Sequence, residues 1–279
     1  METGLKGKTA LITGGGSGIG LGIAKTLAEE GVQLAIASRN PPTEAIEELK
    51  SHGVDAIPIK ADVSDENNVV DMVKSAIEHL GHLDIYINNA AWTWHQPITQ
   101  LTTESWWRTL NTNVSGCVWA CREVSRHMIE RKQGSILIIG STAMFNPLYN
   151  ETSYRVSKTG LNVFMEVLAV ELTLHGIRVN MIVPGGFDTR MVNENNFFTA
   201  ETARGKVSDI IFGEIPMRRL GKPEEVGPAA AFLLSDKLSS YTTGATLVID
   251  GGLKLRPLPL YTDQEITDMN AAPSGQKLD

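Results

Sequence analysis

The octapeptide TGGGSGIG occupies residues 13–20 and is the most informative segment of this chain. A short apolar run at residues 9–13 leads into it, as a buried strand would, and a helical pattern covers residues 18–30. Glycines in such a turn let the chain reverse tightly and let backbone N–H groups approach a phosphate at the positive end of the helix. The glycines alone are a weak signal, but the strand before them and the helix after them predict a pyrophosphate-binding turn.

The same order of strand and helix repeats along the chain. The run ILII at residues 136–139 is apolar at every position, which is typical of strands covered on both faces, as in a parallel sheet. Strands are predicted at residues 9–13, 33–38, 56–60, 83–88, 135–140, 178–183 and 245–250. Helices are predicted at residues 18–30, 43–52, 65–80, 103–131, 152–175 and 223–234, the third of them capped by Ser64. Repeated strand–helix units imply right-handed crossovers, so the predicted fold class is α/β, a Rossmann-type doubly wound parallel sheet of seven strands with helices on both faces.

No linker or low-complexity tract divides this chain before residue 252. We therefore predict a single domain over residues 1–252 and a C-terminal tail at residues 253–279. Residues 262–265 read as a capping box that opens a short helix in the tail. The tail either belongs to the same domain or packs on a neighbouring subunit, and a frayed terminus is the alternative.

The composition excludes several classes of partner. The chain has 25 basic and 32 acidic residues, a net charge of −7, and it lacks the basic cluster that nucleic acid binding requires. No apolar run approaches the length of a membrane span, and the first residues lack the apolar stretch of a signal peptide. Cys117 and Cys121 are too few for a zinc site, so we expect buried thiols and no metal. These features predict a cytoplasmic protein that acts on a small molecule.

The end of the second predicted strand bears on the choice of nucleotide. In dinucleotide-binding folds an acidic residue at this place binds the adenosine ribose. This chain has Ser38, Arg39 and Asn40 there instead. A carboxylate would repel a 2′-phosphate, whereas Arg39 could pair with it. The sequence therefore favours NADP over NAD; the alternative is that Arg39 lies against the adenine and either cofactor is accepted.

Together these motifs resemble those of the short-chain dehydrogenase/reductase family, in its compact branch, over residues 5–252. Asp62 and Val63 match the family's adenine-contacting pair, and NNAA at residues 88–91 matches its Asn-Asn-Ala-Gly, with Ala91 adding one methyl group near the cofactor. The resemblance implies that the cofactor contacts Gly14, Ser17, Gly18, Ile19, Gly20, Ser38, Arg39, Asn40, Asp62, Val63, Asn89, Ala90, Ala91, Tyr154, Lys158, Pro184, Gly185, Phe187 and Thr189.

Four further residues, Asn113, Ser141, Tyr154 and Lys158, match the family's catalytic four. Tyr154 and Lys158 are four residues apart, so they share one face of a helix. A phenol with its ordinary pKa of about 10 is a poor base, and a neighbouring ammonium together with the positive ring of oxidised nicotinamide would lower that pKa. Tyr154 would exchange a proton with the substrate oxygen while Ser141 hydrogen-bonds it and hydride passes to or from the nicotinamide. The resemblance assigns to Asn113 a water that relays protons to Lys158.

All five tryptophans of the chain lie between residues 92 and 119. Trp92, Trp94 and His95 follow Ala91 on a loop that borders the substrate in the family, and residues 188–215, which include Met191, would form a lid. We therefore predict substrate contacts at Trp92, Trp94, His95 and Met191, with packing or rim positions as the alternative. An aromatic wall would suit a flat, apolar or sugar-like substrate.

The predicted function is that of an NAD(P)-dependent oxidoreductase that interconverts a ketone or aldehyde and an alcohol. A sugar or polyol dehydrogenase of the same family is the alternative. A reductase of carbon–carbon double bonds is disfavoured, because such relatives usually depart from this Tyr–Lys spacing, and a cofactor-sensing protein without turnover is a remote alternative. The resemblance also implies a homotetramer or homodimer in which helices at residues 103–131 and 152–175 pair between subunits.

Overall fold

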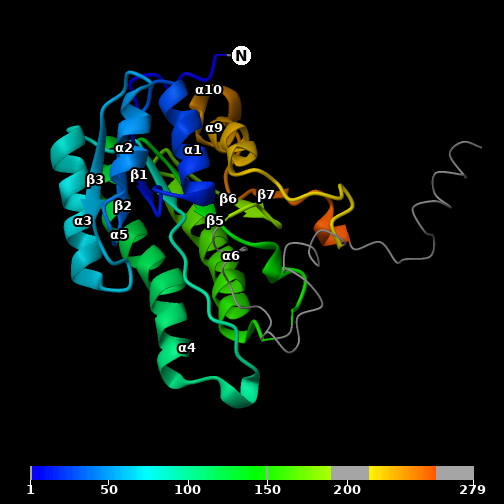
Figure 1. Cartoon of the computed structure of the whole chain (residues 1–279). Helices are drawn as coiled ribbons and strands as arrows, with labels where there is room; N and C mark the ends of the chain where they lie inside the picture. The colour runs from blue at the N-terminus through cyan, green and yellow to red at the C-terminus, as the bar shows by residue number, and fades with distance from the viewer. Residues whose placement is uncertain (1, 149, 190–213, 256–279) are drawn as a thin grey trace, which may run out of the picture.

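Seven parallel strands form one sheet in the order β3-β2-β1-β4-β5-β6-β7 (Figure 1). The computed structural model of the protein describes residues 2–148, 150–189 and 214–255. The strands are β1 (Thr9–Thr13), β2 (Gln33–Ser38), β3 (Ala56–Lys60), β4 (Ile85–Asn88), β5 (Gly134–Ile139), β6 (Ile177–Pro184) and β7 (Thr246–Ile249). Every pairing between neighbouring strands is parallel, which confirms the predicted α/β fold class.

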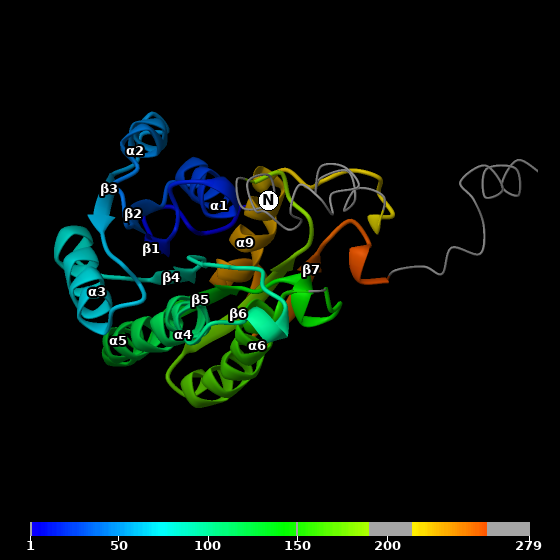
Figure 2. The same cartoon turned by 60° about the horizontal axis from the view of Figure 1, so that its bottom comes forward.

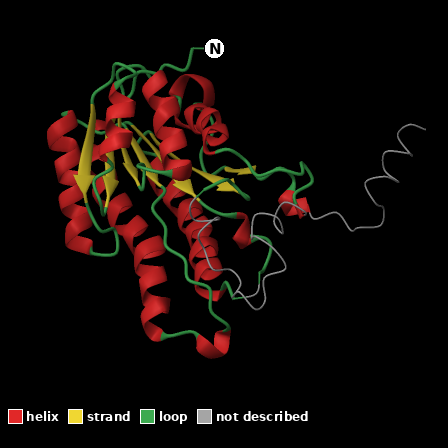
Figure 3. Cartoon of the chain, viewed as in Figure 1, coloured by secondary structure: helices red, strands yellow, loops and turns green. Residues whose placement is uncertain are grey.

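Helices cover both faces of this sheet (Figure 2). One face packs against α1 (Gly18–Glu29), α2 (Thr43–Lys50) and α9 (Gly227–Leu234), and the short α10 (Asp236–Ser239) follows α9. The other face packs against α3 (Glu66–Leu80), α5 (Gly116–Arg131) and α6 (Thr152–Thr173). Figure 3 shows the resulting three layers, with the strands between two sets of helices. The apolar strands are thus buried from both sides, as their composition predicts.

The order of the strands reverses at β1, which pairs with β2 on one side and with β4 on the other. In open parallel sheets a ligand binds where the order reverses, outside the carboxyl ends of the strands. The glycine turn follows β1 and Asn89 follows β4, so the two predicted cofactor segments meet at this place. The topology therefore directs attention to the carboxyl edge between β1 and β4.

Most element boundaries agree with the sequence prediction within two residues, but the predicted cap of α3 is wrong. Asp65, not Ser64, is the N-cap, because its side chain accepts a hydrogen bond from the Asn68 N–H at 2.9 Å. The Ser64 hydroxyl instead donates to the Asp62 carboxylate at 2.7 Å. Both residue types favour caps, so composition could not choose between them.

The helix predicted at residues 103–131 is continuous but not regular. It comprises α4 (Thr103–Leu110), a π-helical segment at Asn111–Ser115, and α5. Such π segments occur frequently at functional sites. Asn113 lies at the centre of this one.

Two predicted features fall largely outside the described residues. The structure does not describe residues 190–213 of the predicted lid or residues 256–279 of the predicted tail. The described part ends with a short 3-10 turn, Leu253–Leu255, and the Asn146 side-chain amide donates to the Leu253 carbonyl at 3.3 Å. No helix within residues 2–148, 150–189 and 214–255 is long and apolar enough to cross a bilayer.

Candidate active site

The glycine turn between β1 and α1 leaves no room for side chains at two positions. A Cβ atom at Gly20 would lie 2.4 Å from the Gly14 carbonyl oxygen, and one at Gly16 would lie 2.4 Å from the Pro42 Cβ. Gly14 and Gly18 have φ values of 65° and 52°, which other residues adopt only with strain. Glycine is therefore required for the tight packing of this turn, which leads into the amino end of α1, a position that favours an anion such as a pyrophosphate.

Asn89, at the end of β4, ties this turn to the neighbouring strand. Its side-chain amide donates to the carbonyls of Thr13 at 3.0 Å and Gly14 at 3.1 Å. The Thr13 hydroxyl accepts hydrogen bonds from the backbone N–H groups of Asn89 and Ala90. Ala91, which replaces the expected glycine, is half-buried beside them.

The predicted adenine end of the site gathers charged residues from three elements. Arg39 and Asn40 are exposed beyond β2, and the Ser38 hydroxyl donates to the Asn40 carbonyl. Partial burial acts to raise the pKa of Asp62, but hydrogen bonds from Ser64 and the charges of Arg39 and Arg108 outweigh it, so that pKa is lowered. Val63 lies against α5, where a Cβ at Gly116 would be 2.3 Å from its carbonyl oxygen. The structure thus brings Arg39 and Asp62 together, with Arg108 as a third charge.

The segment after β6 lies on the other side of the glycine turn. Pro184 ends β6, and the Gly185 N–H donates to the Ile249 carbonyl at 2.9 Å. Phe187 is buried, and Thr189 reaches the glycine turn, since its Cγ2 lies 3.4 Å from the Cβ position of Gly18. The end of this segment therefore lies next to the glycine turn.

Asn113 is buried and its side chain is fully engaged. Its Oδ1 accepts from the Trp92 N–H at 2.7 Å, and its Nδ2 donates to the Trp92 carbonyl and the Ser157 hydroxyl, each at 2.9 Å. Ser157 in turn donates to the Tyr154 carbonyl at 2.6 Å. Asn113 thus joins the tryptophan loop to the helix that carries Tyr154, a link the sequence did not predict.

Ser141, Tyr154 and Lys158 lie beyond the end of β5 and along the first turns of α6. Ser141 lies close enough to Tyr154 for its side chain to act on the pKa of the phenol, which it lowers. Lys158 is buried, its Nζ donates to the Ile139 carbonyl at 2.9 Å, and it lies 5.8 Å from the ring centroid of Tyr154. The three predicted residues therefore do come together.

Burial shifts the pKa values of both Tyr154 and Lys158. Burial and the charge of Glu151 raise the pKa of Tyr154 to about 12, although the Ser141 side chain acts to lower it. Burial also lowers the pKa of Lys158 to about 8. Desolvation thus disfavours both charged forms in the protein alone, and the lowering of the phenol pKa by Lys158 together with oxidised nicotinamide stays a prediction.

Two stacked tryptophans lie on the loop that Asn113 connects to α6. Trp92 and Trp94 stack with their rings 4° from parallel and their centroids 6.3 Å apart, and the Arg108 guanidinium lies 4.6 Å from the Trp92 centroid. His95 Nε2 lies 3.3 Å from the Thr93 hydroxyl, and burial lowers the His95 pKa to about 4, so its ring is neutral near pH 7. Met191 lies outside the described residues.

Three residues near the site were missed by the sequence analysis. Glu151 is buried and precedes Tyr154 by three positions, a helical spacing that could have drawn attention to it. Arg155 donates to two carbonyls of the turn after Ser141. Arg108 stacks on Trp92, and no sequence spacing would reveal this contact.

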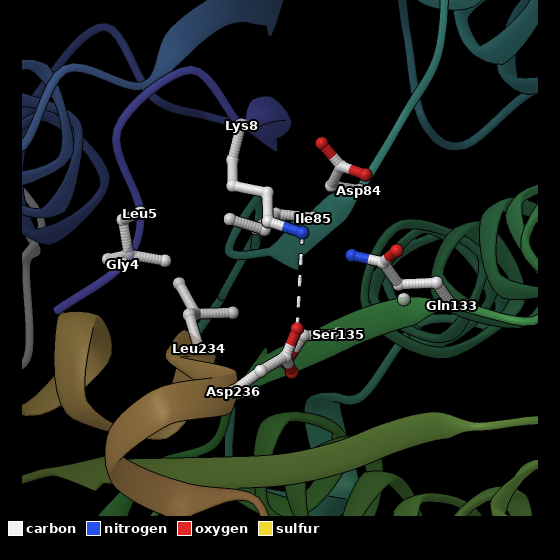
Figure 4. Close-up of a pocket in the computed structure, with 10 residues that line it drawn as sticks. Gly4, Leu5, Lys8, Asp84, Ile85, Gln133, Ser135, Leu234 and Asp236 are labelled. Carbon is white, nitrogen blue, oxygen red and sulfur yellow. Dashed lines mark ion pairs between the residues drawn. The ribbon is translucent and has the colours of Figure 1, made fainter.

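Away from the site, a small cavity of about 10 Å³ lies at the amino ends of β1, β4 and β5 (Figure 4). Its lining includes Lys8 and Asp236, which form an ion pair at 4.0 Å. It has room for one water molecule and lies at the edge of the sheet opposite Tyr154. Among the residues that the structure describes, no three His, Cys, Asp or Glu side chains gather so as to hold a metal.

Comparison with known proteins adds to this geometry. A family model described as enoyl-(acyl carrier protein) reductase matches residues 14–254. Glucose 1-dehydrogenase 2 of Bacillus subtilis (strain 168) is 36% identical over 262 residues, which cover 92% of this chain and 98% of that protein. The 3-oxoacyl-(acyl-carrier-protein) reductase of Chlamydia pneumoniae is 35% identical over 256 residues, which cover 91% of this chain and 99% of that protein. A solved NAD+-bound xylitol dehydrogenase is 33% identical, has a TM-score of 0.81, and covers 89% of this chain and 100% of that one.

Proposed function

This chain belongs to the short-chain dehydrogenase/reductase family of NAD(P)-dependent oxidoreductases, and from that premise we propose that it interconverts a ketone or aldehyde and an alcohol, with NADP preferred. The observation that carries the proposal is the meeting of Ser141, Tyr154 and Lys158 at the carboxyl edge of the sheet, where the glycine turn also lies. A proton-transfer group and a dinucleotide cradle at one edge suit hydride transfer to or from a carbonyl carbon.

Each residue of the proposed site has its own role. The nicotinamide, when bound, supplies or accepts the hydride. Tyr154 gives its proton to the substrate oxygen during reduction and takes one back during oxidation. Ser141, whose side chain acts on the pKa of Tyr154, donates to the same oxygen and positions it. When Lys158 is protonated, its ammonium charge favours the phenolate form of Tyr154. The Asn113 side chain connects the Trp92 loop to α6 through its hydrogen bonds to Trp92 and Ser157.

The residues present fit a dinucleotide. The backbone of the glycine turn would bind the pyrophosphate, because it leads into the amino end of α1, where the helix favours an anion. Asp62 and Val63 would bind the adenine, and Pro184, Gly185, Phe187 and Thr189 would bind the nicotinamide side. Arg39 supports NADP, because it is exposed at the end of β2, where residues 38–40 include no acidic residue and an arginine could pair with a 2′-phosphate.

The tryptophan loop supports a second candidate substrate class. Trp92 and Trp94 present stacked indoles, and Trp94 is 52% exposed. Aromatic faces pack well against the C–H face of a sugar or polyol as well as against flat apolar molecules. The relatives named glucose 1-dehydrogenase 2 and xylitol dehydrogenase favour the sugar or polyol reading.

Two other functions receive less support. The family model carries the description of an enoyl reductase, but Tyr154 and Lys158 keep the spacing on which carbonyl chemistry relies. A cofactor-sensing protein without turnover would have no use for a buried lysine beside a tyrosine. Both functions would be detected by the assay described below.

We also propose a homotetramer or homodimer, built by pairing of α6 and the α4–α5 helix between copies. Val156, Val163, Val167, Val170 and Leu174 form an exposed apolar stripe along and just beyond α6. Trp107 on α4 is 55% exposed. Apolar stripes of this extent usually mark protein interfaces. A cytoplasmic location stays a prediction.

A panel of carbonyl compounds and alcohols, assayed with NADPH, NADH and their oxidised forms, tests the proposal. We expect nicotinamide absorbance to change with at least one carbonyl–alcohol pair, and more efficiently with the NADP pair. Turnover only with α,β-unsaturated acyl compounds would favour the enoyl reductase. Tight cofactor binding with no turnover of any carbonyl, alcohol, sugar or polyol would contradict an enzymatic function.

A further inference from the structure

We propose that Arg155 is a positioning residue that fastens the turn bearing Ser141 to α6 and so sets the Ser141 hydroxyl against Tyr154. The inference rests on the proposed function and concerns a residue outside the matched motifs. Arg155 Nη1 donates to the Ala143 carbonyl at 2.7 Å, and its Nη2 donates to the Phe145 carbonyl at 3.4 Å. A planar guanidinium is suited to hold two acceptors at once.

The turn follows Ser141 directly in the chain and leads into the loop before α6. Ser141 caps the short 3-10 turn Thr142–Met144, and its hydroxyl oxygen accepts from the Ala143 N–H at 3.2 Å. The carbonyl of the same Ala143 receives the Arg155 bond. A shift of the turn would therefore move the Ser141 hydroxyl directly.

Arg155 also belongs to the helical turn that presents the phenol. It follows Tyr154 in sequence, and its N–H donates to the Glu151 carbonyl at 2.8 Å in the first turn of α6. One side chain thus bridges the two elements that carry the two hydroxyl groups.

Phe145 and Asn146, in the same loop, make contacts that do not involve Arg155. Lys254 Nζ lies 4.1 Å from the Phe145 ring centroid, and Asn146 donates to the Leu253 carbonyl. These contacts hold the loop to the C-terminal end of the described chain and do not reach α6. Loss of Arg155 should therefore loosen the turn relative to Tyr154 without unfolding the loop.

The test is a double-mutant cycle between Arg155→Met and Ser141→Ala in the full chain. Arg155→Met should lower kcat about tenfold to a hundredfold, since misplacement of a reacting group by about 1 Å has such effects. Its dissociation constant for NADPH, measured by fluorescence, should stay unchanged. In the Ser141→Ala background the same substitution should lower kcat by less than about threefold, because residues that act through one another are not additive. Equal losses in both backgrounds would overturn the proposal.

Two further variants complete the design. Arg155→Lys should recover part of the lost kcat, because an ammonium can reach one of the two carbonyls, and it replaces Arg155→Met in the cycle if that protein does not fold. Arg126→Met removes an arginine from the surface of α5, where it pairs with Glu123, and should leave kcat unchanged. Tyr154→Phe is assayed in parallel. If this variant keeps its turnover, the proposed function fails. If it is inactive while the losses from Arg155→Met and Ser141→Ala are additive, only the present inference is refuted.

Discussion

Lys158 Nζ lies 5.8 Å from the ring centroid of Tyr154, one helical turn away on the same face of α6. Burial acts on both groups in the same sense, since it lowers the pKa of Lys158 to about 8 and raises that of Tyr154 to about 12. In the protein alone both side chains are therefore biased toward their neutral forms. Burying the two groups costs stability of the fold, and several expected outcomes depend on this relationship.

Replacing Tyr154 with Phe should lower kcat at least about a hundredfold, because the proton donor and acceptor is lost. Binding of NADPH should persist, since the substitution removes a single hydroxyl group. Steady-state kinetics and a fluorescence titration with NADPH measure the two effects. Turnover near the wild-type value would contradict the proposed mechanism.

Replacing Lys158 with Met should stabilise the fold near pH 7 while it abolishes turnover. The folded-state pKa of about 8 lies below the ordinary value of 10.5, so burying the ammonium costs about 3 kcal/mol wherever both states are protonated. Loss of the bond to the Ile139 carbonyl offsets about 1 kcal/mol of this gain. We expect a net increase of about 2 kcal/mol in the free energy of unfolding.

The stability gained in Lys158→Met should change with pH in a defined direction. Between the folded pKa of about 8 and the unfolded value of 10.5 the unfolded chain binds more protons, so the wild type gains stability as the pH rises. The advantage of Lys158→Met should therefore shrink from pH 7 to pH 9.5 in urea unfolding at one protein concentration. Lys74→Met, at an exposed site on α3, serves as the control and should show no such trend. An advantage that does not change with pH would contradict the assignment.

Replacing Arg39 with Asp should move cofactor preference from NADPH toward NADH. A charge-assisted hydrogen bond is worth about 1.5–3 kcal/mol, so the ratio of the two kcat/KM values should fall by about tenfold to a hundredfold. Arg126→Asp makes the same change of charge on the surface of α5 and should leave the ratio alone. If Arg39→Asp also keeps the ratio, Arg39 does not read the 2′-phosphate.

Substrate binding should quench the fluorescence of Trp92 and Trp94. The quenching should largely disappear in Trp92→Phe and Trp94→Phe, because those indoles form the exposed wall beside the proposed site. Trp107→Phe, on the exposed side of α4, should keep it. Quenching that survives in both loop variants would place the substrate elsewhere.

Some of the site could be predicted because its signals are local. The glycine turn is recognisable from the strand before it and the helix after it, and the structure adds only the reason, the 2.4 Å approach of a Cβ at Gly20 to the Gly14 carbonyl. Tyr154 and Lys158 could be paired because four residues make slightly more than one helical turn. The strand predicted at residues 33–38 agrees with β2 for the same kind of reason, since its apolar run is buried from both sides.

Other features depend on neighbours that are distant in sequence. One exception is local: Ser64 and Asp65 are both good caps, and Asp65 caps α3 while the Ser64 hydroxyl donates to Asp62, two residues earlier. The π-helical segment around Asn113 is accompanied by contacts with Trp92 and Ser157, which lie 21 and 44 residues away. Arg155 reaches a turn on another element. No periodic pattern in the chain encodes these contacts.

Residue identity and local spacing were thus enough to predict the seven strands and the pairing of Tyr154 with Lys158, because hydrogen-bonded helices and strands repeat at fixed intervals along the chain. The other members of the predicted site came from the resemblance to a known family. Only the tertiary structure decided the direction of the pKa shifts of Tyr154 and Lys158, the stacking of Arg108 on Trp92 and the fastening of the Ser141 turn by Arg155. The reason is physical: desolvation and side-chain contacts depend on which groups surround a residue after folding, and segments far apart in the sequence supply those groups.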